Sequence, residues 1–173
     1  LEPTVLFDLI SGATKGPLAG RRVVITAGPT REPIDPVRYI SNYSSGKMGY
    51  ALASAARMAG ANVVLVSGPV SIEAPAGVEV RRVTTAQDML EHASGAVDEG
   101  CDLFIATAAV ADYRPDSCAG DKIKKTDEGM SLSLVRNPDT LAAIAARADA
   151  PFTVGFAAET RDVEHYALDK LTR

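Results

Sequence analysis

Apolar residues along this chain fall into short continuous runs, and the segments between the runs show helical periodicity. The runs at 21–28, 61–68, 77–83, 101–110 and 151–159 predict strands. A continuous apolar run without alternating polar positions is typical of a strand covered on both faces. We therefore expect a buried sheet rather than a sheet with one solvated face.

The intervening segments predict helices with recognisable ends. The first begins near residue 47 and is ended by Gly60. Thr85 and Asp88 have the spacing of a capping box, which predicts the start of a second helix. Asn137 as N-cap, with Pro138 at the first helical position, predicts a third. The apolar face of the first helix is formed by Met48, Ala51, Leu52, Ala55, Ala56 and Ala59.

Strands that alternate with helices predict an α/β fold, here a Rossmann-like, doubly wound and mostly parallel sheet. Two segments interrupt the alternation. Residues 29–45 include prolines at 29, 33 and 36 and are expected to be irregular. Residues 121–125 and 130–136 alternate with period two, so they predict a β hairpin or flap within 113–136.

The length of the chain predicts one folded domain. A chain of 173 residues is long enough to bury one core. Residues 1–19 are interpreted as an N-terminal helix and linker, and residues 20–173 as the domain itself. A last helix starts near Asp162, and the chain ends inside it without a capping glycine. We therefore expect the natural domain to continue beyond Arg173.

Composition argues against several classes of protein. Hydrophobic residues make up 46% and charged residues 23%, as in a soluble globular protein. No run approaches the roughly 18 apolar residues of a membrane helix, and a net charge of -4 does not favour nucleic acid. Cys101 and Cys118 lack zinc-site spacing and are interpreted as reduced thiols of a cytosolic protein. His92 and His165 have no evident partner for a triad.

The segment ISNYSSGKMGYA, residues 40–51, is the strongest candidate for an anion site. Residues 44–46 precede the first predicted helix, and N–H groups at a helix N-terminus bind phosphate. The segment is not a P-loop, because Ser41 replaces the first glycine and Met48 replaces the magnesium-binding hydroxyl. The alternative interpretation of this segment is an ordinary helix N-cap followed by a surface lysine, Lys47, without a bound anion.

Three further loops carry candidate chemistry. In residues 107–116, small alanines admit a ligand to the backbone, and Asp112 either contacts a metal or ribose hydroxyl or caps a turn. Residues 121–125 hold the densest positive charge, and an anion site and an edge strand guarded by lysines explain it equally well. Asp139 either starts a helix or holds magnesium on a phosphate.

Two functions of other classes are open at this stage. Tyr166 and Lys170 give the Y-x-x-x-K pair of short-chain NAD(P)-dependent oxidoreductases, but G-x-G-x-x-G is absent after the first strand. Tyrosine and lysine four positions apart on a helix also arise by chance. The second alternative is a non-catalytic nucleotide-binding module.

Five stretches together identify a family. They are ITAGPTREPIDPVRYISNYSSGKMGYALA, AAVADYRP, KIKK, NPD and VGFAAET, in this order. They resemble phosphopantothenoylcysteine synthetase, the phosphopantothenate–cysteine ligase half of the bacterial bifunctional coenzyme A biosynthesis protein. The resemblance extends from about Gly20 to the end of the chain, and the first stretch alone is long and specific.

The resemblance implies a CTP-dependent ligase that requires magnesium. The carboxylate of 4′-phosphopantothenate attacks the α-phosphate of CTP, which gives an acyl-cytidylate and pyrophosphate. The amine of L-cysteine then displaces CMP. This chemistry requires no protein nucleophile, so the protein positions anions and neutralises developing charge.

The resemblance also implies roles for individual residues. Asn42 is expected to bind the activated acyl group, and Lys122 to serve CTP in the first half-reaction; both are expected to be catalytic. Asp139 is the expected phosphate–metal residue. Substrate contacts are expected from Asn42, Ala108 and Ala109. CTP contacts are expected from Ser44, Ser45, Gly46, Ala108, Asp112, Lys122, Pro138, Asp139, Thr140, Leu141, Phe156 and Lys170.

The partners implied by the resemblance are small molecules and a second copy of the chain. The family works as a homodimer with substrate near the interface, so the flap within 113–136 is expected to reach a partner chain. The full-length protein is expected to carry a fused flavin-dependent decarboxylase half. That half is missing here, so no FMN site is expected. Nucleic acid and membrane partners are not expected, and the location is expected to be cytoplasmic.

Overall fold

The computed structural model describes residues 16–125 and 129–156, and its centre is a five-stranded parallel sheet in the order β5-β4-β1-β6-β9. Val24 of the central strand pairs with Val64 on one side and with Phe104 on the other. The strands are β1 (Arg22–Ala27), β4 (Asn62–Ser67), β5 (Glu79–Arg82), β6 (Leu103–Ala106) and β9 (Phe152–Gly155). All carboxyl ends therefore meet at one edge of the sheet.

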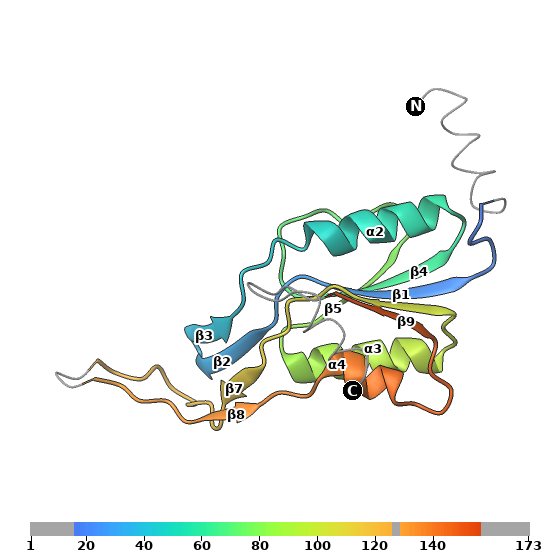
Figure 1. Cartoon of the computed structure of the whole chain (residues 1–173). Helices are drawn as coiled ribbons and strands as arrows, with labels where there is room; N and C mark the ends of the chain where they lie inside the picture. The colour runs from blue at the N-terminus through green and yellow to red at the C-terminus, as the bar shows by residue number, and fades with distance from the viewer. Residues whose placement is uncertain (1–15, 126–128, 157–173) are drawn as a thin grey trace, which may run out of the picture.

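Helices cover both faces of this sheet (Figure 1). Helix α2 (Lys47–Met58) lies on one face, and α3 (Ala86–Asp98) and α4 (Thr140–Ala145) lie on the other. The alternation of β1 divides the core accordingly: Val23 and Ile25 pack on the α2 side, and Val24 packs on the α3 side. All three are fully buried, so this strand is covered on both faces.

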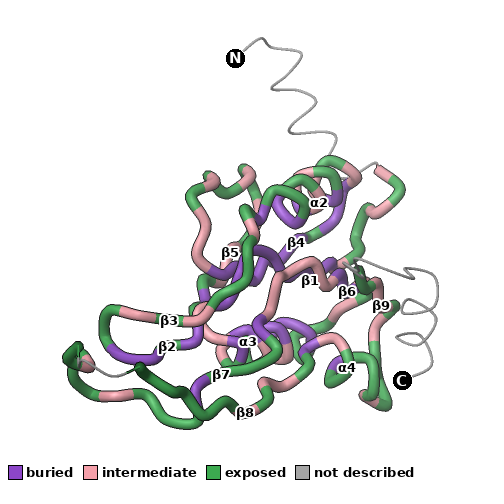
Figure 2. Tube along the Cα trace, turned by 60° about the vertical axis from the view of Figure 1, so that its left-hand side comes forward, coloured by how far each residue is buried: buried purple, intermediate pink, exposed green. Residues whose placement is uncertain are grey.

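Two small antiparallel pairs lie beyond the carboxyl edge. The first joins β2 (Arg31–Asp35) to β3 (Arg38–Ser41), and the second joins β7 (Tyr113–Pro115) to β8 (Leu134–Arg136). The two pairs lie side by side, and the segments between β7 and β8 project outward from them (Figure 1). We call residues 113–125 and 129–136 the arm. Figure 2 shows that most of the arm is exposed.

The predicted α/β fold is confirmed, including the doubly wound parallel sheet and a β flap within residues 113–136. The capping box of Thr85 and Asp88 is present. Gly60 follows the C-cap of α2 at a φ of 94°, a left-handed conformation that favours glycine.

Four local predictions were wrong. The predicted apolar face of α2 is misplaced: Met48, Ala51 and Ala55 are exposed, and the buried residues of the helix are Gly49, Tyr50, Ala53 and Ala56.

The other three errors concern the loops and one cap. Residues 29–45 contain β2 and β3, because a two-stranded pair tolerates prolines where the ladder shifts register, here between Pro33 and Asp35. Residues 121–125 form no strand, and Tyr113–Pro115 pairs with Leu134–Arg136 in their place. Helix α4 is capped by Asp139 and not by Asn137, because the Asp139 carboxylate accepts from Ala142 N.

Some predictions lie outside the described residues. They are the helix within residues 1–15, the helix from Asp162 onward and Lys170 with its partner Tyr166. Residues 16–20, the end of the proposed linker, form a turn against the end of α2, where Leu18 N donates to Ala59 O at 2.9 Å.

The contact of α2 with the sheet gives a stability prediction. A Cβ on Gly49 would lie 2.5 Å from Ala27 Cβ and 2.6 Å from Thr107 Oγ1. Gly49→Ala is therefore expected to lower the free energy of unfolding by about 1–3 kcal/mol, since extra carbon in a filled contact forces the backbones apart. Urea denaturation measures the change.

Gly95 in α3 is the matched control, because a Cβ there meets nothing within 4 Å. Gly95→Ala is expected to stabilise the protein by about 0.5–1 kcal/mol, since alanine reduces the conformational freedom of the unfolded chain. Equal effects of the two substitutions would contradict the assigned packing.

Candidate functional site

The candidate site begins where β1 and β6 end. Beyond the sheet, residues 28–30 and 107–111 continue side by side: Ala109 N donates to Gly28 O at 2.8 Å, and Thr30 N donates to Ala109 O at 3.3 Å. Ala108 N donates to the hydroxyl of Thr26 at 3.3 Å. Ala108 and Ala109, expected to touch substrate, therefore lie at the carboxyl edge of the sheet, where α/β folds bind ligands.

The N-terminus of α2 lies at the same edge. Gly46 is its N-cap, with a φ of 76°, and no side chain caps the helix. The hydroxyl of Ser44 accepts from Gly46 N at 3.2 Å and so shapes the turn before the helix. A Cβ on Gly46 would lie 2.8 Å from Val70 Cγ1, which leaves room only for glycine.

The other two described helices begin differently. Helix α3 has its capping box and also receives the Glu32 carboxylate, which accepts from Ala86 N at 2.9 Å. Helix α4 has the Asp139 carboxylate. Because side chains supply acceptors to α3 and α4 but not to α2, the first N–H groups of α2 are the ones suited to an external anion.

Asn42 connects the α2 loop to the segment after β6. Its Nδ2 donates to Val110 O at 3.0 Å, while Ser41 Oγ donates to Thr30 O at 2.6 Å. The structure thus brings Asn42 to the same edge as Ala108 and residues 44–46. Asn42 is exposed, so a ligand at the edge can reach its side chain.

Asn137 joins the turn before α4 to this edge. Its backbone N donates to Asp112 O, and its Nδ2 donates to Ala111 O, each at 2.8 Å. Arg114 donates to Asn137 Oδ1 at 3.1 Å. Pro138 and Asp112, both expected to contact CTP, are therefore held near one another.

The remaining expected CTP contacts differ in exposure. Asp139 uses Oδ1 to cap α4, accepting from Ala142 N at 3.0 Å. Thr140 is buried, and Leu141 packs on the core beneath α3. Phe156 is 43% exposed just after β9. Only the exposed members of this group, Asp139 and Phe156, present their side chains to a ligand directly.

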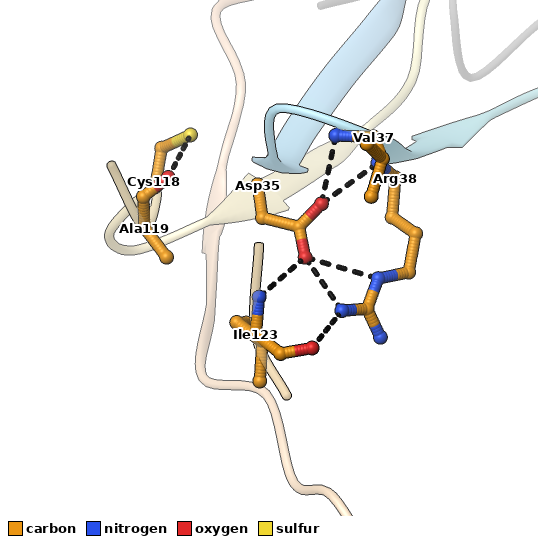
Figure 3. A network of polar contacts seen from close by, with 6 residues as sticks. All are labelled: Asp35, Val37, Arg38, Cys118, Ala119 and Ile123. Atoms are coloured by element: carbon orange, nitrogen blue, oxygen red, sulfur yellow. Dashed lines mark hydrogen bonds and ion pairs between the residues drawn. The ribbon is translucent and has the colours of Figure 1, made fainter. Parts of the chain in front are cut away.

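Lys122 lies apart from the sheet edge, on the arm beside the turn between β2 and β3. The next residue, Ile123, accepts from Arg38 at 2.6 Å and donates to Asp35 Oδ2 at 3.1 Å (Figure 3). An open hollow here is lined by Val37, Arg38, Lys122, Ile123, Lys124, Lys125, Gly129 and Met130. The concentration of lysines makes this hollow cationic.

Asp35 is the buried charge beneath this hollow. Its side chain is fully buried and pairs with Arg38 at 2.7 Å. Burial by itself raises the pKa of Asp35, but the N–H groups of Val37 and Ile123 and the Arg38 guanidinium outweigh it. The pKa of Asp35 therefore lies below its ordinary value, and the carboxylate is ionised at neutral pH.

Sequence reasoning assigned no role to Asp35, Arg38, Thr26 or Thr30. A signal was present for Asp35, because an aspartate followed by proline is typical of an Asx turn. Asp35 Oδ1 indeed accepts from Val37 N and Arg38 N, each at 2.9 Å. Its contact with Ile123, 88 residues away, has no local signal in the sequence.

Residues 18–173 match the family described as the DNA/pantothenate metabolism flavoprotein C-terminal domain. The chain belongs to this family. It is 57% identical, over 159 residues, to the coenzyme A biosynthesis bifunctional protein CoaBC of Vibrio parahaemolyticus, covering 90% of this chain and 40% of that protein. It is 49% identical over 179 residues to CoaBC of Escherichia coli, covering 100% of this chain and 44% of that protein. The chain thus spans less than half the length of these relatives.

The fold of the chain is similar to those of solved structures. The C-terminal domain of a coenzyme A biosynthesis bifunctional protein CoaBC has a TM-score of 0.80 and 46% identity, covering 91% of this chain and 74% of that chain. A Cab2 mutant in complex with phosphopantothenate-cysteine has a TM-score of 0.70 at 19% identity, covering 98% of this chain and 73% of that chain. At that identity the second likeness shows the fold alone.

The described residues contain neither a membrane-spanning helix nor a cluster of metal ligands. None of the helices in residues 16–125 and 129–156 is long and apolar enough to cross a membrane. Within the same residues, no three His, Cys, Asp or Glu side chains gather as a metal site would require.

The environment of Asp35 predicts a pH dependence of stability. Since its folded pKa lies below the ordinary value of 3.8, the ionised carboxylate stabilises the fold fully above that value. The contribution is lost as the pH falls through the folded pKa. Asp35→Asn is therefore expected to lower the free energy of unfolding at neutral pH and to cost progressively less in acid.

Urea denaturation of both proteins at about pH 7 and about pH 3 measures this difference. The gap between wild type and variant should narrow at the lower pH. A gap of the same size at both pH values would show that the Asp35 charge does not stabilise the fold.

Proposed function

We propose that this chain is a ligase domain that joins 4′-phosphopantothenate and L-cysteine, using CTP, in coenzyme A biosynthesis. Family membership and the likeness to the CoaBC relatives support this activity. The observation that carries the proposal is the uncapped start of α2 at the carboxyl edge, beside Asn42 and Ala108. It offers an anion site where this family's characteristic segment lies.

The proposed reaction has two steps. A carboxylate oxygen of 4′-phosphopantothenate attacks the α-phosphorus of CTP, the bond to the β-phosphate oxygen breaks, and pyrophosphate leaves. The free amine of L-cysteine then attacks the acyl carbon of the acyl-cytidylate. CMP leaves with the original carboxylate oxygen, and the amine gives up a proton as the amide forms.

The protein contributes position and charge to both steps. Residues 44–46 and the first N–H groups of α2 hold phosphate. Asn42 orients the acyl group in the second step, and the edge around Ala108 and Ala109 holds substrate against the backbone. Lys122 neutralises charge on the triphosphate in the first step. Asp112, Pro138–Leu141, Phe156 and Lys170 complete the proposed nucleotide contacts.

Magnesium is proposed as a companion of CTP. Its usual sites combine one or two carboxylates with substrate phosphates, and Asp139 has one oxygen engaged with Ala142 N and its side chain exposed. The residues present therefore fit an ion carried mainly by the triphosphate. When bound, it neutralises phosphate charge, and Asp139 is the residue that would hold it.

A homodimer is part of the proposal. The arm projects from the domain (Figure 1). Exposed apolar side chains belong to the arm and to the neighbouring β2–β3 pair. They include Val37, Tyr39, Tyr113, Met130, Leu132 and Leu134. A second copy covering this surface would bring the arm toward a partner's site. In the natural protein, the fused decarboxylase half is a further proposed neighbour.

Nucleotide selectivity tests the proposal. The melting temperature should rise with CTP and magnesium together, and less with ATP, GTP or NADPH. A ligand at about 100 times its dissociation constant adds about 2.7 kcal/mol to the free energy of unfolding, a shift of several degrees. An equal response to all nucleotides would contradict CTP as the co-substrate, and a response to NADPH alone would favour the oxidoreductase alternative.

Lys122 gives a second test in the full-length protein. Loss of one charge-assisted hydrogen bond costs roughly 1.5–3 kcal/mol, so Lys122→Gln should slow CTP-dependent pyrophosphate release about 10- to 100-fold. Arg21→Gln is the control and should stay within about twofold, because Arg21 precedes β1 at the opposite edge of the sheet and pairs with Asp102 there. An unchanged rate in Lys122→Gln would remove this lysine from the proposed mechanism.

A further inference from the structure

The buried carboxylate of Asp35 has both oxygens occupied at the base of an exposed arm (Figure 3). Oδ1 accepts from the N–H groups of Val37 and Arg38, each at 2.9 Å, which closes the turn between β2 and β3. Oδ2 accepts from Arg38 Nε at 3.0 Å and from Ile123 N at 3.1 Å. Oδ1 thus stabilises the turn between β2 and β3, and Oδ2 binds the arm through Ile123.

Arg38 completes the attachment of the arm. Its guanidinium pairs with Asp35 Oδ2 at 2.7 Å and donates to Ile123 O at 2.6 Å. Both polar groups of the Ile123 backbone are therefore bound by the Asp35–Arg38 pair. No strand lies at this point in the described part of the arm, so these side chains act where a neighbouring strand would.

The residues flanking this attachment are Lys122 and Lys124. A second contact, from Ala119 N to Ile34 O at 3.0 Å, holds the preceding turn of the arm to the same strand. Lysine has a flexible four-carbon side chain, so the position of its ammonium group depends on how firmly its backbone is held. If the contacts of Ile123 with Asp35 and Arg38 were lost, the backbone of Lys122 would be restrained only by the contact of Ala119 with Ile34.

We propose that Asp35 is a positioning residue, which, through Arg38 and the Ile123 backbone, sets the location of Lys122 for a nucleotide phosphate. The inference rests on the proposed role of Lys122 with CTP and assigns the support of Lys122 to Asp35, whose side chain is fully buried. Asp35 is buried and acts on the nucleotide only through the segment that it holds, whereas Arg38 is 40% exposed and lines the same hollow as Lys122.

Asp35→Asn is the informative substitution because it keeps the shape of the side chain. The new amide has one oxygen where the carboxylate had two, so it cannot accept from both the turn and Ile123 N. One of these two contacts is lost without creating a cavity, and the Arg38 charge loses its partner.

Glu32→Gln is the matched control. Glu32 lies on the same strand as Asp35, the two residues are 1% and 3% exposed, and each accepts a backbone N–H from a distant segment. The partner of Glu32 is Ala86 at the start of α3, far from the arm in sequence. Both variants are therefore expected to lower the melting temperature. Only Asp35→Asn is expected to displace Lys122 as well.

The experiment measures pyrophosphate release by the full-length protein and its melting temperature. We expect Asp35→Asn to raise the KM for CTP at least about tenfold and to leave the KM for L-cysteine within about twofold. Glu32→Gln should change only the melting temperature. The double variant Asp35→Asn/Lys122→Gln should match Lys122→Gln alone, because residues acting through one another are not additive.

Three outcomes would overturn the inference: a wild-type KM for CTP in Asp35→Asn, an equal rise in Glu32→Gln, or additive losses in the double variant. If the wild-type protein released no pyrophosphate from CTP, the proposed function would fail instead, and with it the nucleotide role of Lys122. Amide hydrogen exchange at Ile123 then separates the two failures. Faster exchange in Asp35→Asn supports the attachment of the arm, and unchanged exchange refutes it.

Discussion

The carboxyl edge of this domain depends on side chains that satisfy backbone groups lacking a strand partner. Beyond the ends of β1 and β6 the chain is irregular, yet Thr26 accepts from Ala108 N, Thr30 accepts from Ala111 N and Asn42 donates to Val110 O. A buried N–H or C=O without a partner costs roughly 1–3 kcal/mol. The loops of the site therefore have few alternative arrangements, although they contain little regular secondary structure.

The same principle extends from the sheet edge to the arm. Glu32 joins β2 to the start of α3, and Asp35 joins β2 to Ile123. A two-stranded pair is marginal by itself, so these carboxylates hold β2 in addition to its pairing with β3. A sheet edge held in this way and an attached cationic arm suit the proposed reaction, in which the substrates supply the nucleophiles and the protein supplies position and charge.

The sequence predicted the parallel sheet well because continuous apolar runs, such as 21–28 and 61–68, report burial on both faces directly. It predicted the edge less completely. The prolines of residues 29–36 predict irregular structure, although β2 forms there. Asn137 has the sequence position of a helix cap, but its side-chain amide donates to Ala111 O instead. The sequence around Asp35 indicates a turn but not the contact of Asp35 with Ile123, because Ile123 is distant in sequence. Local patterns encode turns and caps, but long-range polar contacts appear only after folding.

The central proposal is that 4′-phosphopantothenate is joined to L-cysteine through activation by CTP, without a protein nucleophile. The most direct measurement starts from 4′-phosphopantothenate labelled with ¹⁸O in its carboxylate, together with CTP, magnesium, L-cysteine and the full-length protein. Mass spectrometry then follows the label. The account predicts one labelled oxygen in CMP, transferred when the acyl-cytidylate is broken by the amine. Product formation with unlabelled CMP, or with the label in orthophosphate, would contradict it.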